Sequence, residues 1–178
     1  MLETRTVLTY SDYRNLPEDD HSKYEMLWGG VLFVAGAPSF RHQRVQARLI
    51  EKMLRHVDER SLGGIVGRIN LYRDKYNYVQ PDISYFTEAQ VSILDGEQAV
   101  HLVPLLVVEL LSPSTAHHDR NDKRRWYAEL GVQEYWLVDC DARSIEVIDL
   151  RTDEARVEDP VRSTGLPDLI LPVSGIFS

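Results

Sequence analysis

The chain has 178 residues, a length that predicts a single domain over residues 1–178 with its core at about 9–150. Its residues are 43% hydrophobic and 27% charged, a composition that excludes global disorder. The formal net charge of −8 excludes a broad basic footprint for nucleic acid, so any such contact must depend on a local patch. One cysteine, Cys140, excludes an internal disulfide, and the lack of a membrane-length apolar stretch or a signal-peptide pattern predicts a soluble cytoplasmic protein with no membrane partner.

The first forty residues carry signals for a short helix and a hairpin. Residues 9–12 have the spacing of a capping box, which predicts a helix that residues 15–17 would end. Two β-rich runs, 23–28 and 31–35, flank a pair of glycines at 29–30. Two glycines between such runs are typical of a hairpin, because a tight turn needs positive φ.

A longer helix is predicted from the capping residue Ser39 to about Arg60. Apolar side chains recur at three- and four-residue spacing and define one buried face, made of Val45, Leu49, Ile50, Met53, Leu54 and Val57. The opposite face is basic and carries Arg41, Arg44, Arg48, Lys52 and Arg55. Such a face is usually a solvated side of a helix, but it is also the best local patch for a phosphate backbone.

The rest of the chain alternates strands with a second helix. Strands are predicted over residues 65–72, 79–86, 105–111, 134–138 and 145–150, with a polar stretch through Glu97. Residues 105–111 are apolar on both faces, which is typical of a central strand covered on two sides. A helix from about Asp119 to Leu130 ends at Gly131, a good C-cap. These elements predict an α/β or α+β fold with a mixed β-sheet flanked by helices.

Glu109 lies in the middle of the apolar central strand. Burying a carboxylate costs several kcal/mol unless it is paired or bound to a cation, so something must compensate it. Asp82 poses the same question after Pro81, whose missing N–H suggests an edge or bulge position. If the two strands are neighbours, the two carboxylates converge and repel each other. Mg²⁺ or Mn²⁺ would relieve that repulsion in a site of two carboxylates, a backbone carbonyl, for which Leu110 is the candidate, and waters.

Lys123 is the third member of the predicted site. On the following helix it shares a stripe with Arg120, Tyr127 and Leu130. Tyr127 is expected to face the sheet, which draws Lys123 toward the end of the Glu109 strand. An ammonium group there would orient a metal-bound water and stabilise charge developing on a phosphate.

Several short motifs in a fixed order carry a family resemblance. They are Tyr24-Glu25 before the glycine turn, His42 at the opening of a helix, Pro81-Asp82, Glu109 through Thr115, Asp119 through Lys123 to Tyr127, and Gly131 through Trp136. Together, over roughly residues 9–150, they resemble the Uma-type restriction endonucleases of the PD-(D/E)XK phosphodiesterase superfamily. The superfamily's usual lysine stands two residues after the Glu, where this chain has Leu111. In the Uma-type branch a lysine on the following helix replaces it, which Lys123 matches.

The resemblance implies a restriction-endonuclease-like fold and magnesium-dependent hydrolysis of a DNA phosphodiester by a metal-activated water. It implies Asp82 and Glu109 as metal ligands, Lys123 as the catalytic lysine and Glu25 as an additional acid. The edge of the site is expected at His42 and Tyr127. No small organic cofactor is expected.

Each of these residues also has a purely structural interpretation. Glu109 would form a structural ion pair, and Lys123 would form an (i, i+4) surface pair with Asp119. Glu25 would belong to the polar face of a hairpin, and His42 would pack or cap near a helix start. The segment His117-His118-Asp119 is interpreted as a solvated loop at the rim of the site. A second hypothesis therefore keeps the nuclease fold without turnover, as an inert interaction module or accessory subunit.

DNA is the expected partner. Candidate contacts are Arg41, Arg44, Arg48, Arg120 and Arg124. Because the chain is acidic, we expect the monomer to bind DNA weakly and in a salt-sensitive way. This favours either a DNA contact supplied by a partner or a homodimer that aligns two patches.

Overall fold

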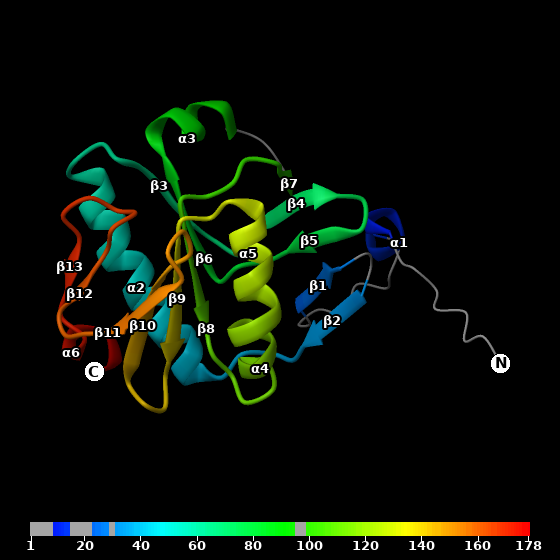
Figure 1. The fold of residues 1–178 in the computed structure, drawn as a ribbon. Coiled ribbons are helices and arrows are strands. Elements are labelled where there is room, and N and C mark those ends of the chain that lie inside the picture. The colour runs from blue at the N-terminus through cyan, green and yellow to red at the C-terminus, as the bar shows by residue number, and fades with distance from the viewer. Residues whose placement is uncertain (1–8, 15–22, 29–30, 95–98) are drawn as a thin grey trace.

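The computed structural model describes residues 9–14, 23–28, 31–94 and 99–178. At its centre lies a six-stranded mixed sheet, in which β8 and β9 are parallel and all other neighbours are antiparallel (Figure 1). In sheet order its strands are β11 (Glu154–Val157), β10 (Ser144–Asp149), β9 (Glu134–Asp139), β8 (Leu106–Leu110), β6 (Ile83–Thr87) and β3 (Gly63–Gly67). Every residue of β8 is buried, which confirms the prediction of a central strand covered on both faces.

A second, five-stranded sheet lies beside the first. Its order is β2 (Val31–Ala35), β1 (Lys23–Leu27), β5 (Asn77–Val79), β4 (Asn70–Asp74) and β7 (Ala99–Val100). β1 and β2 pair antiparallel, as predicted, although their turn at residues 29–30 lies outside the described residues. The predicted capping box begins α1 (Tyr10–Arg14), because Thr9 Oγ1 accepts from the N–H of Asp12 and Asp12 Oδ2 accepts from the N–H of Thr9. The predicted end of α1 at residues 15–17 also lies outside the described residues.

Two of the predicted strands are wrong in one respect, because each is divided between the two sheets. Residues 65–72 separate into β3 and β4 at Arg68, whose φ of 42° lies in the left-handed region and turns the chain out of the first sheet. Residues 79–86 separate into β5 and β6 around Pro81, which cannot donate to a ladder. The second crossing leaves Asp82 at the junction of the two sheets. β6 itself is an internal strand, not the edge that the proline suggested.

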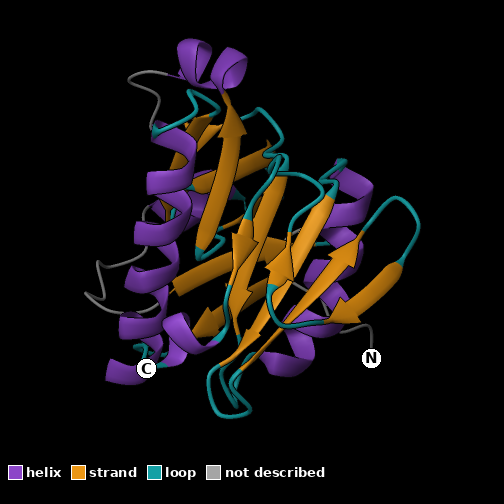
Figure 2. Cartoon of the chain, turned by 90° about the vertical axis from the view of Figure 1, so that its left-hand side faces the viewer, coloured by secondary structure: helices purple, strands orange, loops and turns teal. Residues whose placement is uncertain are grey.

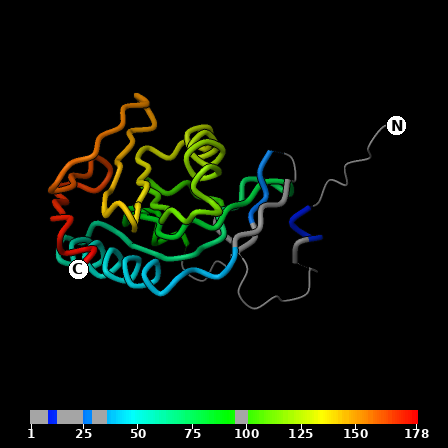
Figure 3. Tube along the Cα trace, turned by 90° about the horizontal axis from the view of Figure 1, so that it is seen from below, coloured from blue at the N-terminus to red at the C-terminus, as the bar shows by residue number. Residues whose placement is uncertain are grey.

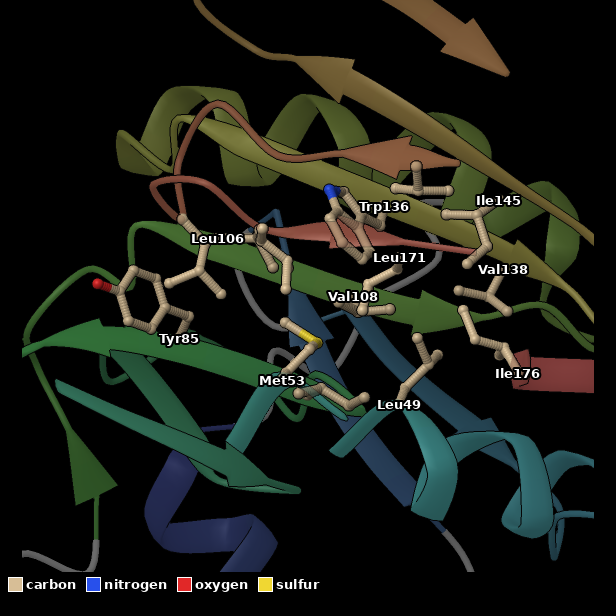
Figure 4. Packing of buried hydrophobic residues seen from close by; sticks show 14 of the residues in the cluster. Leu49, Met53, Tyr85, Leu106, Val108, Trp136, Val138, Ile145, Leu171 and Ile176 are labelled. Atoms are coloured by element: carbon tan, nitrogen blue, oxygen red, sulfur yellow. The ribbon is translucent and has the colours of Figure 1, made fainter. Parts of the chain in front are cut away.

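The helix α2 (Phe40–Asp58) covers one face of the six-stranded sheet (Figure 4). Ser39 Oγ accepts from the N–H of His42 and caps it, as predicted. The buried side chains of α2 pack with alternate residues of the sheet such as Val108 and Trp136. Leu54, which the spacing placed on this face, is instead exposed. The C-terminal elements β12 (Val161–Arg162), β13 (Ile170–Leu171) and α6 (Ser174–Phe177) join this layer, with α6 beside α2 (Figure 3).

The opposite face of the sheet is covered by a helical segment in three parts, so that helices lie on both sides of the strands (Figure 2). They are α4 (Ala116–His118), the π-helical turn η1 (Asp119–Lys123) and α5 (Arg124–Leu130). The segment starts before the predicted residue, and its C-cap Gly131 has a φ of 101°, as a left-handed cap requires. The stretch predicted only as polar contains the helix α3 (Glu88–Leu94). Because α3 buries none of its side chains, its sequence does not need the apolar periodicity from which a helix is predicted.

Side chains alternate across the central strand. Leu106, Val108 and Leu110 of β8 belong to the core on the α2 side, whereas Val107 belongs to the core on the α5 side. The period of two therefore directs Glu109 to the face that η1 and α5 cover. None of the described helices is both long and apolar enough to cross a membrane.

Candidate active site

Glu109 is held by two groups from the helical segment above it. Its Oε1 accepts a 2.7 Å hydrogen bond from the hydroxyl of Tyr127 and lies 2.6 Å from Nζ of Lys123. All three side chains are buried. Burial and the neighbouring carboxylate raise the pKa of Tyr127 well above its ordinary value, so the phenol stays protonated and donates. Tyr127 and Lys123 therefore supply the compensation that the buried carboxylate of Glu109 requires.

Lys123 contacts three carboxylates at once. Its Nζ lies 2.6 Å from Glu109 Oε1, 3.0 Å from Glu25 Oε1 and 3.4 Å from Asp119 Oδ1. Burial by itself lowers the pKa of an ammonium group, but Glu109 and then Glu25 outweigh it and hold the pKa of Lys123 well above its ordinary value. Lys123 is thus a buried permanent cation at neutral pH. It is the last residue of the π-helical turn η1. Such turns are rare in proteins overall, but they are often found at functional sites.

Glu25 reaches the same place from the second sheet. It lies on β1, and its Oε1 accepts a 2.9 Å hydrogen bond from the backbone N–H of Gln80. Gln80 precedes the Pro81-Asp82 junction, so this bond ties the carboxylate of Glu25 to the segment that carries Asp82. The ion pair between Glu25 and Lys123 joins the second sheet to the helical segment.

Asp82 is fixed by contacts from β8 and α2. Its Oδ2 accepts a 2.9 Å hydrogen bond from the N–H of Leu110, and its backbone carbonyl accepts a 2.8 Å bond from Gln46 Nε2. His42 Nε2 donates to the carbonyl of Leu110 at 3.2 Å and lies 3.6 Å from Asp82 Oδ2. Because Ile83 pairs with Val108, the next residues outward on the two strands are Asp82 and Glu109.

Most of these groups line one cavity of about 580 Å³. The four residues predicted as catalytic are between 1% and 7% exposed and lie in its deep part: Glu25, Asp82, Glu109 and Lys123. Leu110 and His42 line it as well, whereas Tyr127 supports Glu109 from behind. The structure therefore brings the predicted site residues together, from both sheets, α2 and η1. Their chemical roles remain predictions.

The sequence reasoning missed Asp119 as a member of this cluster. The sequence predicts Asp119 either as a surface partner of Lys123 or as part of a solvated loop at the rim, but the side chains of Asp119 and Lys123 are both buried. Burial raises the pKa of Asp119 to about 6, while Lys123 lowers it and Glu109 raises it. The signal that could have found it is the four-residue spacing of Asp119, Lys123 and Tyr127, which puts all three on one helical stripe.

His118 is also closer to the site than predicted. It belongs to α4, not to a solvated loop, and its side chain is only 11% exposed. Its Nδ1 lies 2.9 Å from Asp122 Oδ2, and its Nε2 lies 4.0 Å from Glu25 Oε2. The adjacent His117 is exposed, so the two rings do not share one environment.

The donor set decides which metal would suit the cavity. Its carboxylates and the carbonyl of Leu110 are hard oxygen donors, which fit Mg²⁺ or Mn²⁺ and not a soft metal. Within the described ranges, no group of three or more His, Cys, Asp or Glu side chains is already arranged to hold an ion. Cys140 also lines the cavity, but burial, followed by Asp139 and Asp141, raises the pKa of its thiol to about 11. Asp82, Glu109 and Leu110 therefore fit a hard cation chemically.

The arginines predicted to contact DNA are all engaged within the chain. Of the five, only Arg41 lines the cavity. The pairs are Arg41 with Asp141 (2.6 Å), Arg44 with the Ser178 carbonyl, Arg48 with Ser178 Oγ (2.8 Å), Arg120 with Glu146 (2.7 Å) and Arg124 with Asp153 (2.6 Å). A contact between these arginines and phosphate would compete with bonds already made.

The architecture defines a class of protein. The chain superposes on the crystal structure of a "putative nuclease belonging to DUF820" from Anabaena variabilis ATCC 29413 with a TM-score of 0.80, covering 96% of this chain and 97% of that one. The two share 18% sequence identity, so the likeness establishes a restriction-endonuclease-like fold.

The sequence places the protein in a family within that class. The Uma2 family, described as "Putative restriction endonuclease", matches residues 10–174, and the chain belongs to this family. It is also 28% identical over 141 residues to uncharacterized protein sll1609 of Synechocystis sp. (strain ATCC 27184 / PCC 6803 / Kazusa), which covers 78% of each chain. A second protein of that organism, uncharacterized protein slr1290, is 29% identical over 144 residues, covering 79% of this chain and 73% of the relative.

Proposed function

We propose that this protein is a metal-dependent endonuclease that hydrolyses DNA phosphodiester bonds in the cavity around Asp82, Glu109 and Lys123. Membership of the Uma2 family and the nuclease-type fold support a nuclease-like function in general. The observation that carries the specific proposal is the meeting of Glu25, Asp82 and Glu109 with one buried lysine at a single solvent-connected cavity.

The proposed cofactor is Mg²⁺ or Mn²⁺, held by the carboxylates of Asp82 and Glu109 and by the carbonyl of Leu110. Such an ion supplies a Lewis acid and a water of lowered pKa. The chain's own part is to hold the ligands in place. Leu110 N–H orients Asp82, while Tyr127 and Lys123 both bind Oε1 of Glu109. His42 orients the carbonyl of Leu110.

Lys123 is proposed to act as a fixed positive charge and not as a base. The raised pKa keeps its ammonium group protonated at neutral pH, so it can stabilise negative charge that develops on the phosphate. Glu25 is proposed to position that ammonium group through the 3.0 Å ion pair. A lysine two residues after Glu109, where Leu111 stands, is not needed for this role.

The inert-module hypothesis is the second candidate, and one observation favours it. Lys123 already pairs with both Glu109 and Glu25, so protein groups alone compensate part of the negative charge of the cluster. A metal titration separates the two hypotheses. A working site should gain thermal stability with Mg²⁺ or Mn²⁺, because an ion that binds the native state stabilises it, whereas an inert module should not.

The decisive experiment is cleavage of plasmid and oligonucleotide DNA with Mg²⁺, Mn²⁺ or a chelator. We expect the wild type to cut with metal, the Asp82→Ala variant to be inactive, and Glu154→Gln, at an exposed residue of β11 that does not line the cavity, to cut normally. Equal cutting by wild type and Asp82→Ala would reject the proposal.

The proposal extends to partner and location. Because the candidate arginines are paired within the chain, we propose that a monomer binds DNA weakly and that a homodimer aligns two arginine patches. We also propose that the protein works in the cytoplasm, where its single cysteine would stay reduced.

A further inference from the structure

The residues that line the mouth of the cavity have no part in the proposed hydrolysis. Its deep part holds the buried carboxylates and Lys123, whereas exposed residues such as Phe40, Arg41, Gln43 and Arg68 line its outer part. An aromatic ring and arginines at the entrance of a phosphodiester site are the elements that bind a nucleotide through its base and its phosphate.

Phe40 has no structural reason to be aromatic. It is the first residue of α2, and its side chain is 82% exposed, more than that of any other large hydrophobic residue in the described part of the chain. It belongs to neither hydrophobic core cluster, since the buried face of α2 starts at Val45. The helix is capped by Ser39, so its first turn does not depend on Phe40. The ring is therefore held at the cavity mouth with its surface available to a ligand.

Arg68 differs from the other arginines near the site. Among the described residues, no carboxylate pairs with it, whereas Arg41 on the same cavity is paired with Asp141. It turns the chain between β3 and β4 with a φ of 42°. This left-handed conformation is energetically unfavourable for a residue with a Cβ atom, whereas glycine adopts it readily. The chain thus keeps an arginine at a position where glycine would fold more easily.

We propose that Phe40 and Arg68 form a binding subsite for single-stranded DNA, in which a base stacks on the Phe40 ring and an adjacent phosphate pairs with Arg68. This inference rests on the proposed nuclease function, whose substrate class it narrows. A strand released from its duplex, at an end, a flap or a bubble, can bring its backbone down to the buried carboxylates. Stacking on an aromatic ring accepts any base, because every base has a π-face, so we infer little sequence preference at this subsite.

Two further features favour a single strand over an intact duplex. The cavity of about 580 Å³ is of the size that encloses small ligands, which corresponds to nucleotides and not to a double helix. A duplex would also need a wide basic surface, but the predicted arginines are paired within the chain and the net charge is −8. A duplex would first have to expose a nucleotide, which costs unstacking.

The test measures DNA binding without turnover, by fluorescence anisotropy of short labelled oligonucleotides in chelator, with the wild type and matched variants. Phe40→Ala removes the ring and Phe40→Tyr keeps it. Arg68→Gly removes the charge and relieves the left-handed backbone. Ile170→Ala removes another exposed apolar side chain, and Arg143→Gly removes another arginine with positive φ (54°), and neither residue lines the cavity.

We expect the wild type to bind single strands more tightly than the same sequence as a duplex. Phe40→Ala should weaken single-strand binding about fivefold or more, the lower end of what one stacked base contributes. Arg68→Gly should weaken it as well, because it removes the cation that pairs with a phosphate. Phe40→Tyr and both control variants should bind as the wild type does. Arg68→Gly should keep or raise the melting temperature, so its loss of binding is not loss of fold.

Equal affinity for single and double strands, or unchanged binding by Phe40→Ala, would overturn the subsite. Failure of the subsite is distinct from failure of the proposed function. If duplex DNA is cut with metal and Phe40→Ala cuts equally well, the nuclease stands and the subsite falls. If single strands bind through Phe40 and Arg68 but no metal supports cleavage, the subsite stands and the hydrolytic proposal falls.

Discussion

The backbone N–H of Leu110 donates a 2.9 Å hydrogen bond to Oδ2 of Asp82, at the junction where β6 begins and β8 ends. This one bond fixes the orientation of a carboxylate that lies outside any strand, in the short segment between the two sheets. The same bond holds the backbone of Leu110, whose carbonyl is a proposed metal ligand. The geometry of the proposed site therefore depends on Asp82 both as a ligand and as an acceptor.

Replacing Asp82 separates these two contributions. Asp82→Ala leaves the buried N–H of Leu110 without this acceptor, so we expect a loss of about 1–3 kcal/mol in the free energy of unfolding together with loss of cleavage. Asp82→Asn keeps an acceptor oxygen but loses the charge, so it should be almost as stable as the wild type and still inactive. Urea unfolding and cleavage assays measure the two effects. An active Asp82→Asn variant would argue against a ligand role.

Removing the Lys123 ammonium group should destabilise the fold strongly at neutral pH. Lys123→Met leaves Glu25, Glu109 and Asp119 buried without their shared cation, which costs about 3–5 kcal/mol for a broken buried ion pair. The deficit should shrink as the pH falls, because the uncompensated carboxylates then take up protons. Urea unfolding at several pH values tests this, with the exposed Lys75→Met as control. Equal stability of Lys123→Met and the wild type at neutral pH would contradict the ion-pair network.

Asp119 makes a separate prediction about pH. Its folded pKa of about 6 lies above the ordinary value of 3.8, so the folded protein retains this proton more strongly than the unfolded chain. The stability that this group contributes is fully present below about pH 4 and is lost as the pH rises to about 6. Relative to the wild type, Asp119→Asn should therefore gain about 2–3 kcal/mol between pH 4 and pH 7. A difference between the two proteins that does not change with pH would show that Asp119 is ionised throughout.

The sequence predicted the elements whose signals are local. The apolar run of β8, the capped helix α2, the strands β9 and β10 and the C-cap Gly131 all appear in the structure, because each depends on periodicity, a capping side chain or a turn. The hydrophobic pattern carries no mark of the change of sheet at Arg68, since residues on both sides of it alternate as in one strand. The backbone conformation of a single non-glycine residue decides that change.

The candidate site was predictable in membership but not in its connections. Glu109 and Asp82 are conspicuous because carboxylates are rare in strands of this kind. The contact of Glu25 with Lys123 joins different sheets and distant parts of the chain, which only the tertiary structure fixes. Burial of the pair formed by Asp119 and Lys123 could not be predicted either, because most pairs at this spacing lie on the surface.

Glu134 shows why a buried carboxylate alone does not identify a site. It lies on β9, next to the strand of Glu109, and is fully buried. Its carboxylate accepts from Trp136 Nε1, from Ser163 Oγ, from both N–H and Oγ1 of Thr164, and from the N–H of Gly165, and it does not line the cavity. These bonds hold the C-terminal segment against the central sheet, so its role is structural.

Substitutions at Glu134 and Glu109 should therefore have contrasting effects on stability and cleavage. Glu134→Ala leaves several buried donors without an acceptor, so we expect a loss of at least about 3 kcal/mol in unfolding free energy, with cleavage by the folded fraction unchanged. Glu109→Gln keeps the shape of the side chain and an acceptor for Tyr127 but loses the charge, so it should abolish cleavage and any stabilisation by Mg²⁺. Thermal unfolding with and without metal, followed by cleavage assays below the melting temperature, measures both. If Glu109→Gln still cuts DNA, the buried pair of Glu109 and Lys123 is a structural one like the cluster around Glu134, and Glu109 is not a metal ligand.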